Sequence, residues 1–184
     1  KYFDVLIEYA KEDIEEILIK VSVTNKSSLP APIDIIPLVY FRNTWAWDKE
    51  AKKPKLRKIE DQNIFCDSSL GNYYLSFSSD ELTLFCDNDR NGTVLYDLAA
   101  EGLYFKDGIN DYLVGNKKES VNPNLEGTKV GLLSHQIIDA NVTAVRYYRL
   151  AKNKLAFDAQ KIESVISQRK KEADEFYQDL HAEK

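Results

Sequence analysis

The segment 106–129 is rich in residue types that can bind a polar ligand, at a place where a β protein would ordinarily have a short turn. The side chains in it that can hydrogen-bond sugar hydroxyls are Asp107, Asn110, Asp111 and Asn122. Lys106 or Lys129 could hold an anion, and Gly108 and Gly127 permit the tight backbone turns that such a loop needs. One interpretation is a carbohydrate-contacting loop. The alternative is an Ω-type loop whose Asp and Asn side chains satisfy its own backbone, or a loop that docks against another domain.

A second candidate site lies in the segment 42–48, which contains both tryptophans of the chain. Trp45 and Trp47 could stack on the apolar C–H face of a sugar ring. Polar neighbours that could hydrogen-bond sugar hydroxyls are Arg42, Asn43 and Asp48. The alternative is that both tryptophans pack under the following polar stretch, 48–62, or against a partner domain.

Other catalytic or metal chemistry has little support in the residue types. His135 and His181 are far apart in the sequence, and neither is accompanied by Cys or carboxylates at metal-ligand spacing. The run Asp87–Gly92 matches the start of a calcium-binding EF-hand loop, but Leu98 stands at the twelfth position, where such a loop needs Glu. We interpret this run as a polar turn with Gly92 at positive φ, and we predict no metal and no cofactor.

Charge and composition limit the class of partner. The formal net charge of −5 gives no reason to expect nucleic acid or an anionic membrane as a partner, and no stretch is apolar for long enough to span a membrane. One basic run comprises Lys49, Lys52, Lys53, Lys55, Arg57 and Lys58. It lacks interleaved aromatic side chains, so we interpret 48–62 as a solvated hairpin excursion. Cys66 and Cys86 lie in apolar stretches and are predicted to be buried free thiols, with a disulfide as the alternative.

Alternation of apolar and polar residues predicts a mainly β chain. Residues 2–9 and 17–24 each alternate with period two, as half-buried strands do. The stretch 33–41 is apolar on both faces, as in a central strand, and Pro37 within it indicates a bulge or an edge. Further strands are predicted at 63–66, 73–78, 82–86, 128–138 and 142–150.

Helical spacing replaces this alternation after Phe157. The apolar residues that follow it are Ile162, Val165, Ile166, Ala173, Phe176, Tyr177 and Leu180, and Asp158 is the expected N-cap. We therefore predict an antiparallel β-sandwich with a long C-terminal α-helix. The expected domains are a β-sandwich over 1–156 and an amphipathic helix over 157–184.

A set of short motifs occurs along the chain in a particular order. They are Tyr2–Val5, Glu8–Lys11, Ile17–Ile19, Val23–Asn25, Phe41–Trp45, Lys106–Tyr112, Val121–Pro123, Gly127–Lys129 and the helix around Arg169–Tyr177. Together they resemble the N-terminal β-domain of microbial proteins of glycoside hydrolase family 63, the processing α-glucosidases. The resemblance covers most of the chain and is weakest over 49–100.

The resemblance implies a β-sandwich of the super-sandwich type followed by an (α/α)6 barrel. In that family the barrel holds both carboxylates of an inverting reaction, and nothing in this chain matches it, so we assign no catalytic residue. The helix over 157–184 would lead to the barrel. We expect a non-catalytic domain that supports the barrel and helps to shape the entrance to its active site. The candidate substrate-contacting residues are Trp45, Trp47, Asp107, Asn110 and Asp111.

Two other functions remain open at this point. One is a free-standing carbohydrate-binding module, which would bind an oligosaccharide by itself. The other is a purely structural interaction domain. The chain begins at Lys1 and contains no Met, so we expect it to be a piece of a longer protein. We expect that protein to be located in the cytoplasm of a microbe and not to be secreted.

Overall fold

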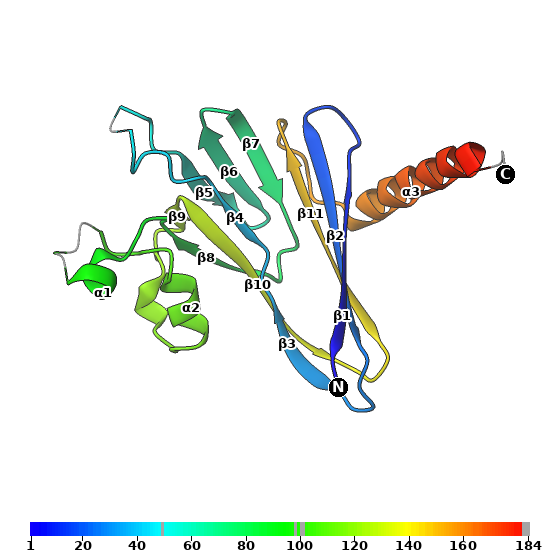
Figure 1. The fold of residues 1–184 in the computed structure, drawn as a ribbon, viewed down its shortest axis with the longest axis horizontal. Coiled ribbons are helices and arrows are strands. Elements are labelled where there is room, and N and C mark those ends of the chain that lie inside the picture. Colours follow the sequence, from blue (N-terminus) through cyan, green and yellow to red (C-terminus); the bar gives the residue numbers. More distant parts are fainter. Residues whose placement is uncertain (49, 98, 100–101, 182–184) are drawn as a thin grey trace. The chain divides into compact units, whose positions relative to one another are not determined.

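A computed structural model describes residues 1–48, 50–97, 99 and 102–181. The chain is mainly β, with antiparallel sheets and a C-terminal helix, which confirms the predicted fold class and fits a β-sandwich-like fold (Figure 1). The strands are β1 (Phe3–Ala10), β2 (Glu16–Asn25), β3 (Ala31–Ile35), β4 (Leu38–Tyr40), β5 (Lys55–Glu60), β6 (Asn63–Ser68), β7 (Gly71–Ser76), β8 (Leu82–Cys86), β9 (Glu126–Gly127), β10 (Lys129–Ile138) and β11 (Thr143–Ala151). The helices are α1 (Gly92–Tyr96), α2 (Gly108–Leu113) and α3 (Ala159–His181), with a 3-10 turn at Lys118–Ser120.

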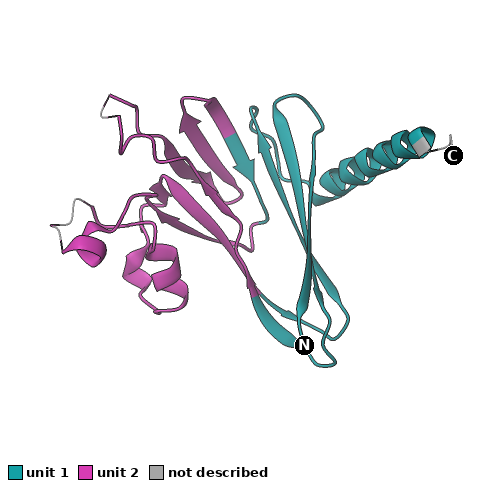
Figure 2. Cartoon of the chain, viewed as in Figure 1, with its two compact units in different colours: residues 1–33, 74–78, 136–184 teal, residues 34–73, 79–135 magenta. Residues whose placement is uncertain are grey.

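The chain divides into two compact units (Figure 2). Unit 1 consists of residues 1–33, 74–78 and 136–184, and unit 2 consists of residues 34–73 and 79–135. Within the described ranges, no helix combines the length and the apolar character needed to cross a membrane.

Unit 1 is built on three long antiparallel strands. β2 lies between β1 and β11, with Val5 opposite Val23 and Tyr148 opposite Ile19. The end of β7 pairs with the other side of β11. The turn between β10 and β11 has Asn141 at φ 62°, a left-handed conformation that Asn tolerates. The predicted strands at 2–9, 17–24, 128–138 and 142–150 are thus confirmed.

The C-terminal helix α3 forms where its apolar spacing predicts it. The Asp158 carboxylate accepts a hydrogen bond from the Lys161 backbone N–H at 3.0 Å, which confirms the expected N-cap. The first turns of α3 bury Ile162 and Ile166 against Leu18 of β2. From residue 167 to residue 180 every side chain of the helix is exposed.

Unit 2 contains two groups of paired strands. β10 pairs with β4 and β8, and β5 pairs with β6 and β9. Side chains without exposed surface form the core of this unit: Leu56, Ile64, Phe85, Val130 and Leu132. Pro37 separates β3 from β4, so the apolar stretch 33–41 is interrupted as its proline indicated. The strands predicted at 63–66, 73–78 and 82–86 are confirmed as β6, β7 and β8.

Several expectations from the sequence are corrected by the structure. The stretch 48–62 is not wholly a solvated excursion, because its second half forms β5 and buries Leu56 completely. Gly92 does not occupy a positive-φ turn but begins α1, whose N-cap is Asn91. Both cysteines are buried and free, as predicted. Lys49 and Leu98, to which the basic run and the calcium argument referred, lie outside the described residues.

Candidate functional site

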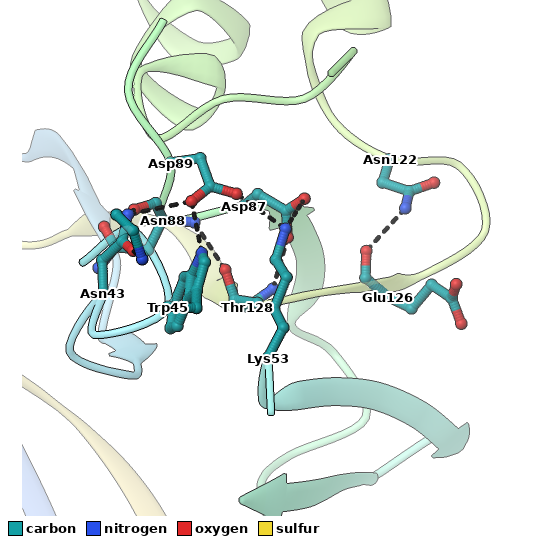
Figure 3. Close-up of polar contacts among 10 residues, drawn as sticks. Asn43, Trp45, Lys53, Asp87, Asn88, Asp89, Asn122, Glu126 and Thr128 are labelled. Atoms are coloured by element: carbon teal, nitrogen blue, oxygen red, sulfur yellow. Dashed lines mark hydrogen bonds and ion pairs between the residues drawn. The ribbon is translucent and has the colours of Figure 1, made fainter. Parts of the chain in front are cut away.

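Polar side chains from distant parts of unit 2 meet where β4 and β8 end and β10 begins (Figure 3). We call this set of contacting residues the Asp89 cluster, and its members are Asn43, Trp45, Lys53, Asp87, Asn88, Asp89 and Thr128. Each enters the cluster from a segment that directly follows or precedes a strand. The cluster therefore joins the tryptophan segment 42–48 to the end of the 106–129 segment.

Asp89 is the centre of this arrangement. Its Oδ1 accepts hydrogen bonds from the indole Nε1 of Trp45 at 2.7 Å and from Nδ2 of Asn43 at 3.0 Å. Its Oδ2 lies 2.8 Å from the Lys53 ammonium, and Figure 3 shows the Trp45, Asn43 and Lys53 side chains converging on this carboxylate. One carboxylate therefore holds three segments together, because it can accept several donors at once.

Lys53 links the two acidic residues of the cluster. Its ammonium also lies 3.0 Å from Asp87 and 5.8 Å from the ring centroid of Trp45. Burial lowers the pKa of Lys53, but its hydrogen bonds to Asp89 and Asp87 and their charges outweigh burial, so the pKa is raised above its ordinary value. Lys53 thus stays charged at neutral pH and neutralises part of the cluster's negative charge.

Backbone groups are satisfied by side chains of the same cluster. The Asn88 backbone N–H donates to Oγ1 of Thr128 at 2.7 Å, and the Thr128 backbone N–H donates to Asp87 Oδ1 at 3.0 Å. The Asn88 amide group donates to the Phe41 carbonyl at 2.9 Å. Such local side-chain bonds fix the backbone of loops that have no strand partner.

The predicted site residues divide into two kinds. Trp45 is half-buried and its indole N–H is used within the cluster. Asp107 accepts a hydrogen bond from Asn91 at 3.1 Å, and Asp111 pairs with Lys117 at 3.0 Å, which raises the pKa of that lysine. These three side chains support the local structure in the way the structural alternative describes.

Trp47 and Asn110 are arranged differently. The Trp47 side chain is 69% exposed, and the Arg42 guanidinium lies 5.1 Å from its ring centroid. Asn110 is exposed on α2. Of the five predicted residues, these two are exposed, whereas the other three are partly buried.

The 106–129 segment contains more regular structure than its composition indicates. It forms α2, a 3-10 turn and the short strand β9. Gly108 and Gly127 are needed for close approach: a Cβ on Gly108 would overlap the Ser120 carbonyl oxygen, and one on Gly127 would overlap that of Cys86. Asn122 donates to the Glu126 carbonyl at 2.7 Å (Figure 3). The loop thus satisfies part of its own backbone, as the Ω-type alternative describes.

Sequence reasoning did not place Asp87, Asp89 and Lys53 in the site. The available signal was the run of Asp and Asn directly after the apolar strand β8, since such runs are common where side chains tie down loops. The sequence offers Asn43 as a hydrogen-bonding partner for a sugar, but its amide group donates to the Asn88 carbonyl at 2.9 Å and to Asp89 at 3.0 Å.

The chemistry that the cluster can perform is limited. The carboxylates of Asp87 and Asp89 both form ion pairs with Lys53. Burial raises the pKa of the neighbouring Cys86 thiol to about 11, so it stays protonated and poorly nucleophilic. Among the described residues there is no group of three or more His, Cys, Asp and Glu side chains that could hold a metal ion. The arrangement is suited to holding loops in place and presenting Trp47.

The chain is similar to a yeast protein over most of its length. The chain is 30% identical over 217 aligned residues to the uncharacterized protein YMR196W of Saccharomyces cerevisiae, and 96% of the chain is covered. The chain spans about a fifth of the length of that relative, 20%. No family model matches the chain.

Proposed function

We propose that this chain is a non-catalytic β-domain of a glycoside hydrolase that acts on α-glucosides. It would support a catalytic (α/α)6 barrel in the same polypeptide and help to shape the entrance to the active site. The observation that carries the proposal is the convergence of motifs that resemble glycoside hydrolase family 63. The segment Phe41–Trp45 bonds to the region around Asp89, which in turn bonds to Thr128 of the motif Gly127–Lys129.

The contacts between these motifs are specific. Asn91, two residues after Asp89, donates to Asp107 at 3.1 Å, and Lys129 donates from its ammonium to the Lys106 carbonyl at 2.8 Å. Motifs that are far apart in the sequence are thereby parts of one region of unit 2. The engaged carboxylates in this region are consistent with a supporting role, because glycoside hydrolysis needs a free acid and a free base or nucleophile.

Trp47 is the residue that would contact the sugar. An exposed indole offers a flat apolar face for the C–H groups of a pyranose, and Arg42 beside it offers hydrogen-bond donors to the hydroxyls. Trp45 and Asp107 would act indirectly, by holding the segment that carries Trp47.

The test uses the full polypeptide that contains this chain, assayed against a panel of α-linked glucose disaccharides. We expect the protein to hydrolyse at least one of them, and Trp47→Ala to lower kcat/KM roughly three- to tenfold with little change in Tm. Tyr40→Ala is the matched control, because Tyr40 is also exposed in unit 2, at 57%, but lies on β4. Absence of hydrolysis across the panel, or equal effects of the two variants, would contradict the proposal.

A free-standing carbohydrate-binding module is the second candidate, and the exposed Trp47 with its adjacent Arg42 favours it equally. Titration of the purified chain with the same disaccharides and their longer oligomers distinguishes the two functions. A binding module saturates with ligand by itself, whereas an entrance-shaping domain binds only weakly without the barrel.

A further inference from the structure

β1 is an end strand that exposes apolar side chains on both of its faces. Among the described residues its pairing partner is β2, so its other edge is open. Val5 and Ile7 on one face are 51% and 50% exposed, and Leu6 on the other face is 52% exposed. The sequence predicted a strand here with one buried face. The strand is confirmed, but neither face is buried. Proteins usually protect such an edge with charges, proline or a bulge, because an open apolar edge invites pairing with another strand.

α3 runs across the sheet of unit 1 towards this edge. Glu163 accepts a hydrogen bond from Tyr147 of β11 at 2.7 Å and lies 2.7 Å from Lys20 of β2. Two turns further on, Lys170 pairs with Glu8 of β1 at 3.2 Å. The helix thus crosses β11, β2 and β1 in that order, and Figure 1 shows it continuing outward beyond them.

The outer half of α3 overhangs the open edge. The helix continues for eleven residues from Lys170 to His181, which is about 16 Å at 1.5 Å per residue. Neighbouring strands lie about 4.8 Å apart, so this length covers the width of roughly three strands. Most of the stability of a helix in a protein comes from packing against other elements. The outer half of α3 packs against no strand among the described residues.

The overhanging part has an apolar face that points the same way as its buried part. Leu180 follows Ile162 by eighteen residues, which is five full helical turns, so both lie on one face. Tyr177 lies close to that face and Phe176 beside it, with the two rings in an edge contact at 5.4 Å. Tyr177 and Leu180 are 59% and 60% exposed.

We infer that a further β-strand pairs with the open edge of β1, beneath the overhanging half of α3. The strand belongs to a part of the same polypeptide outside residues 1–184. Its side chains on one face would pack under Tyr177 and Leu180, and those on the other would continue the row of Val5 and Ile7. This inference goes beyond the proposed function and does not depend on it.

The length of the relative and the geometry of α3 both favour this occupant. The chain matches a fifth of a much longer protein, so residues that could supply a strand exist in a polypeptide of that kind. A second copy paired antiparallel through its own β1 would carry its own α3 on the same face of the sheet. The overhanging halves of both helices would then have to share the space over the two paired β1 strands.

Hydrogen exchange measured by mass spectrometry on the full polypeptide tests the inference. In an end strand, alternate backbone amides point away from the sheet and exchange rapidly, whereas in an inner strand all amides are protected. We expect every amide of residues 3–10 to be protected. Rapid exchange of about half of them would overturn the inference, and this result does not require any variant to fold.

A double variant, Val5→Lys with Ile7→Lys, locates the partner. We expect it to speed exchange in residues 3–10 and in one further segment outside residues 1–184 by about tenfold or more. Ile137→Lys is the matched control, because Ile137 is a strand residue of unit 1 that is 69% exposed but lies on β10. Faster exchange confined to residues 3–10, or a dimer in light scattering that the double variant dissociates, would contradict the inference. The dimer would assign the edge to a second copy.

Discussion

Replacing Asp89 by Ala removes the acceptor on which three segments of unit 2 converge. The Trp45 indole loses its hydrogen bond of 2.7 Å and becomes a half-buried donor without that partner. Asn43 keeps its bond to the Asn88 carbonyl, and Lys53 keeps its ion pair with Asp87. The loss is therefore concentrated on Trp45, while the other two donors are partly compensated.

The expected size of the effect follows from these contacts. A half-buried donor left unsatisfied costs about 1–2 kcal/mol. The lost Lys53 contact adds at most about 0.5 kcal/mol, because that side chain is 44% exposed and solvent screens the pair. We expect Asp89→Ala to lower the free energy of unfolding by about 2 kcal/mol in total. Asp89→Asn keeps one oxygen acceptor and should cost roughly half as much.

Urea unfolding of the chain, followed by tryptophan fluorescence, measures this change. The two tryptophans, Trp45 and Trp47, both lie in the affected segment. A double-mutant cycle of Asp89→Ala with Trp45→Phe should give a coupling energy of about 1 kcal/mol. Asp174→Ala, on the exposed half of α3, is the control and should change stability by less than about 0.5 kcal/mol. A loss below about 0.5 kcal/mol for Asp89→Ala, or additive effects in the cycle, would refute the reasoning.

Three further predictions concern packing, the thiol and acid stability. Gly127→Ala should destabilise unit 2 by about 1–3 kcal/mol in urea unfolding, because its Cβ would overlap the Cys86 carbonyl, whereas Gly102→Ala meets only an ordinary contact at 3.5 Å. The thiol of Cys86, whose pKa burial raises to about 11, should resist a thiol reagent in the native protein at neutral pH and react after unfolding; rapid native reaction would show that it is accessible. The hydrogen bond from Lys20 lowers the pKa of Glu163 in the folded protein. The pair therefore stabilises the fold fully at pH values above 4.5, the usual carboxyl pKa, and this stabilisation is lost as the pH falls through the lower pKa of the folded state. Glu163→Gln should remove that part of the acid dependence of the urea midpoint, and an unchanged dependence would mean that the pair contributes nothing measurable.

Local patterns in the sequence were enough to predict most elements. Period-two alternation located β1 and β2, and helical spacing located α3, because each pattern is a property of consecutive residues. Composition failed for β5, where Leu56 is fully buried among basic residues and a single apolar side chain is too weak a signal. It also failed for α2, whose glycine and aspartate content is typical of a loop.

The predicted site residues lie in two segments that the structure brings into contact. Residue type singled out the 42–48 and 106–129 segments, and the Asp89 cluster joins them. Residue type could not separate Trp45, with its indole N–H engaged, from Trp47, with most of its surface exposed, although the two are two residues apart. The difference depends on which of them faces Asp89, and this is a property of the loop's backbone conformation.

The sequence by itself determined the mainly β class, the C-terminal helix and the burial of both cysteines, because these follow from local hydrophobic periodicity. Only the tertiary structure decided that Asp89 is the centre of the cluster, since its partner Trp45 is 44 residues away and no local pattern connects them. Only the tertiary structure showed that β1 is an end strand and that α3 extends beyond it. Alternation reports that a strand has apolar faces, but the neighbours that cover those faces come from contacts between residues far apart in the chain.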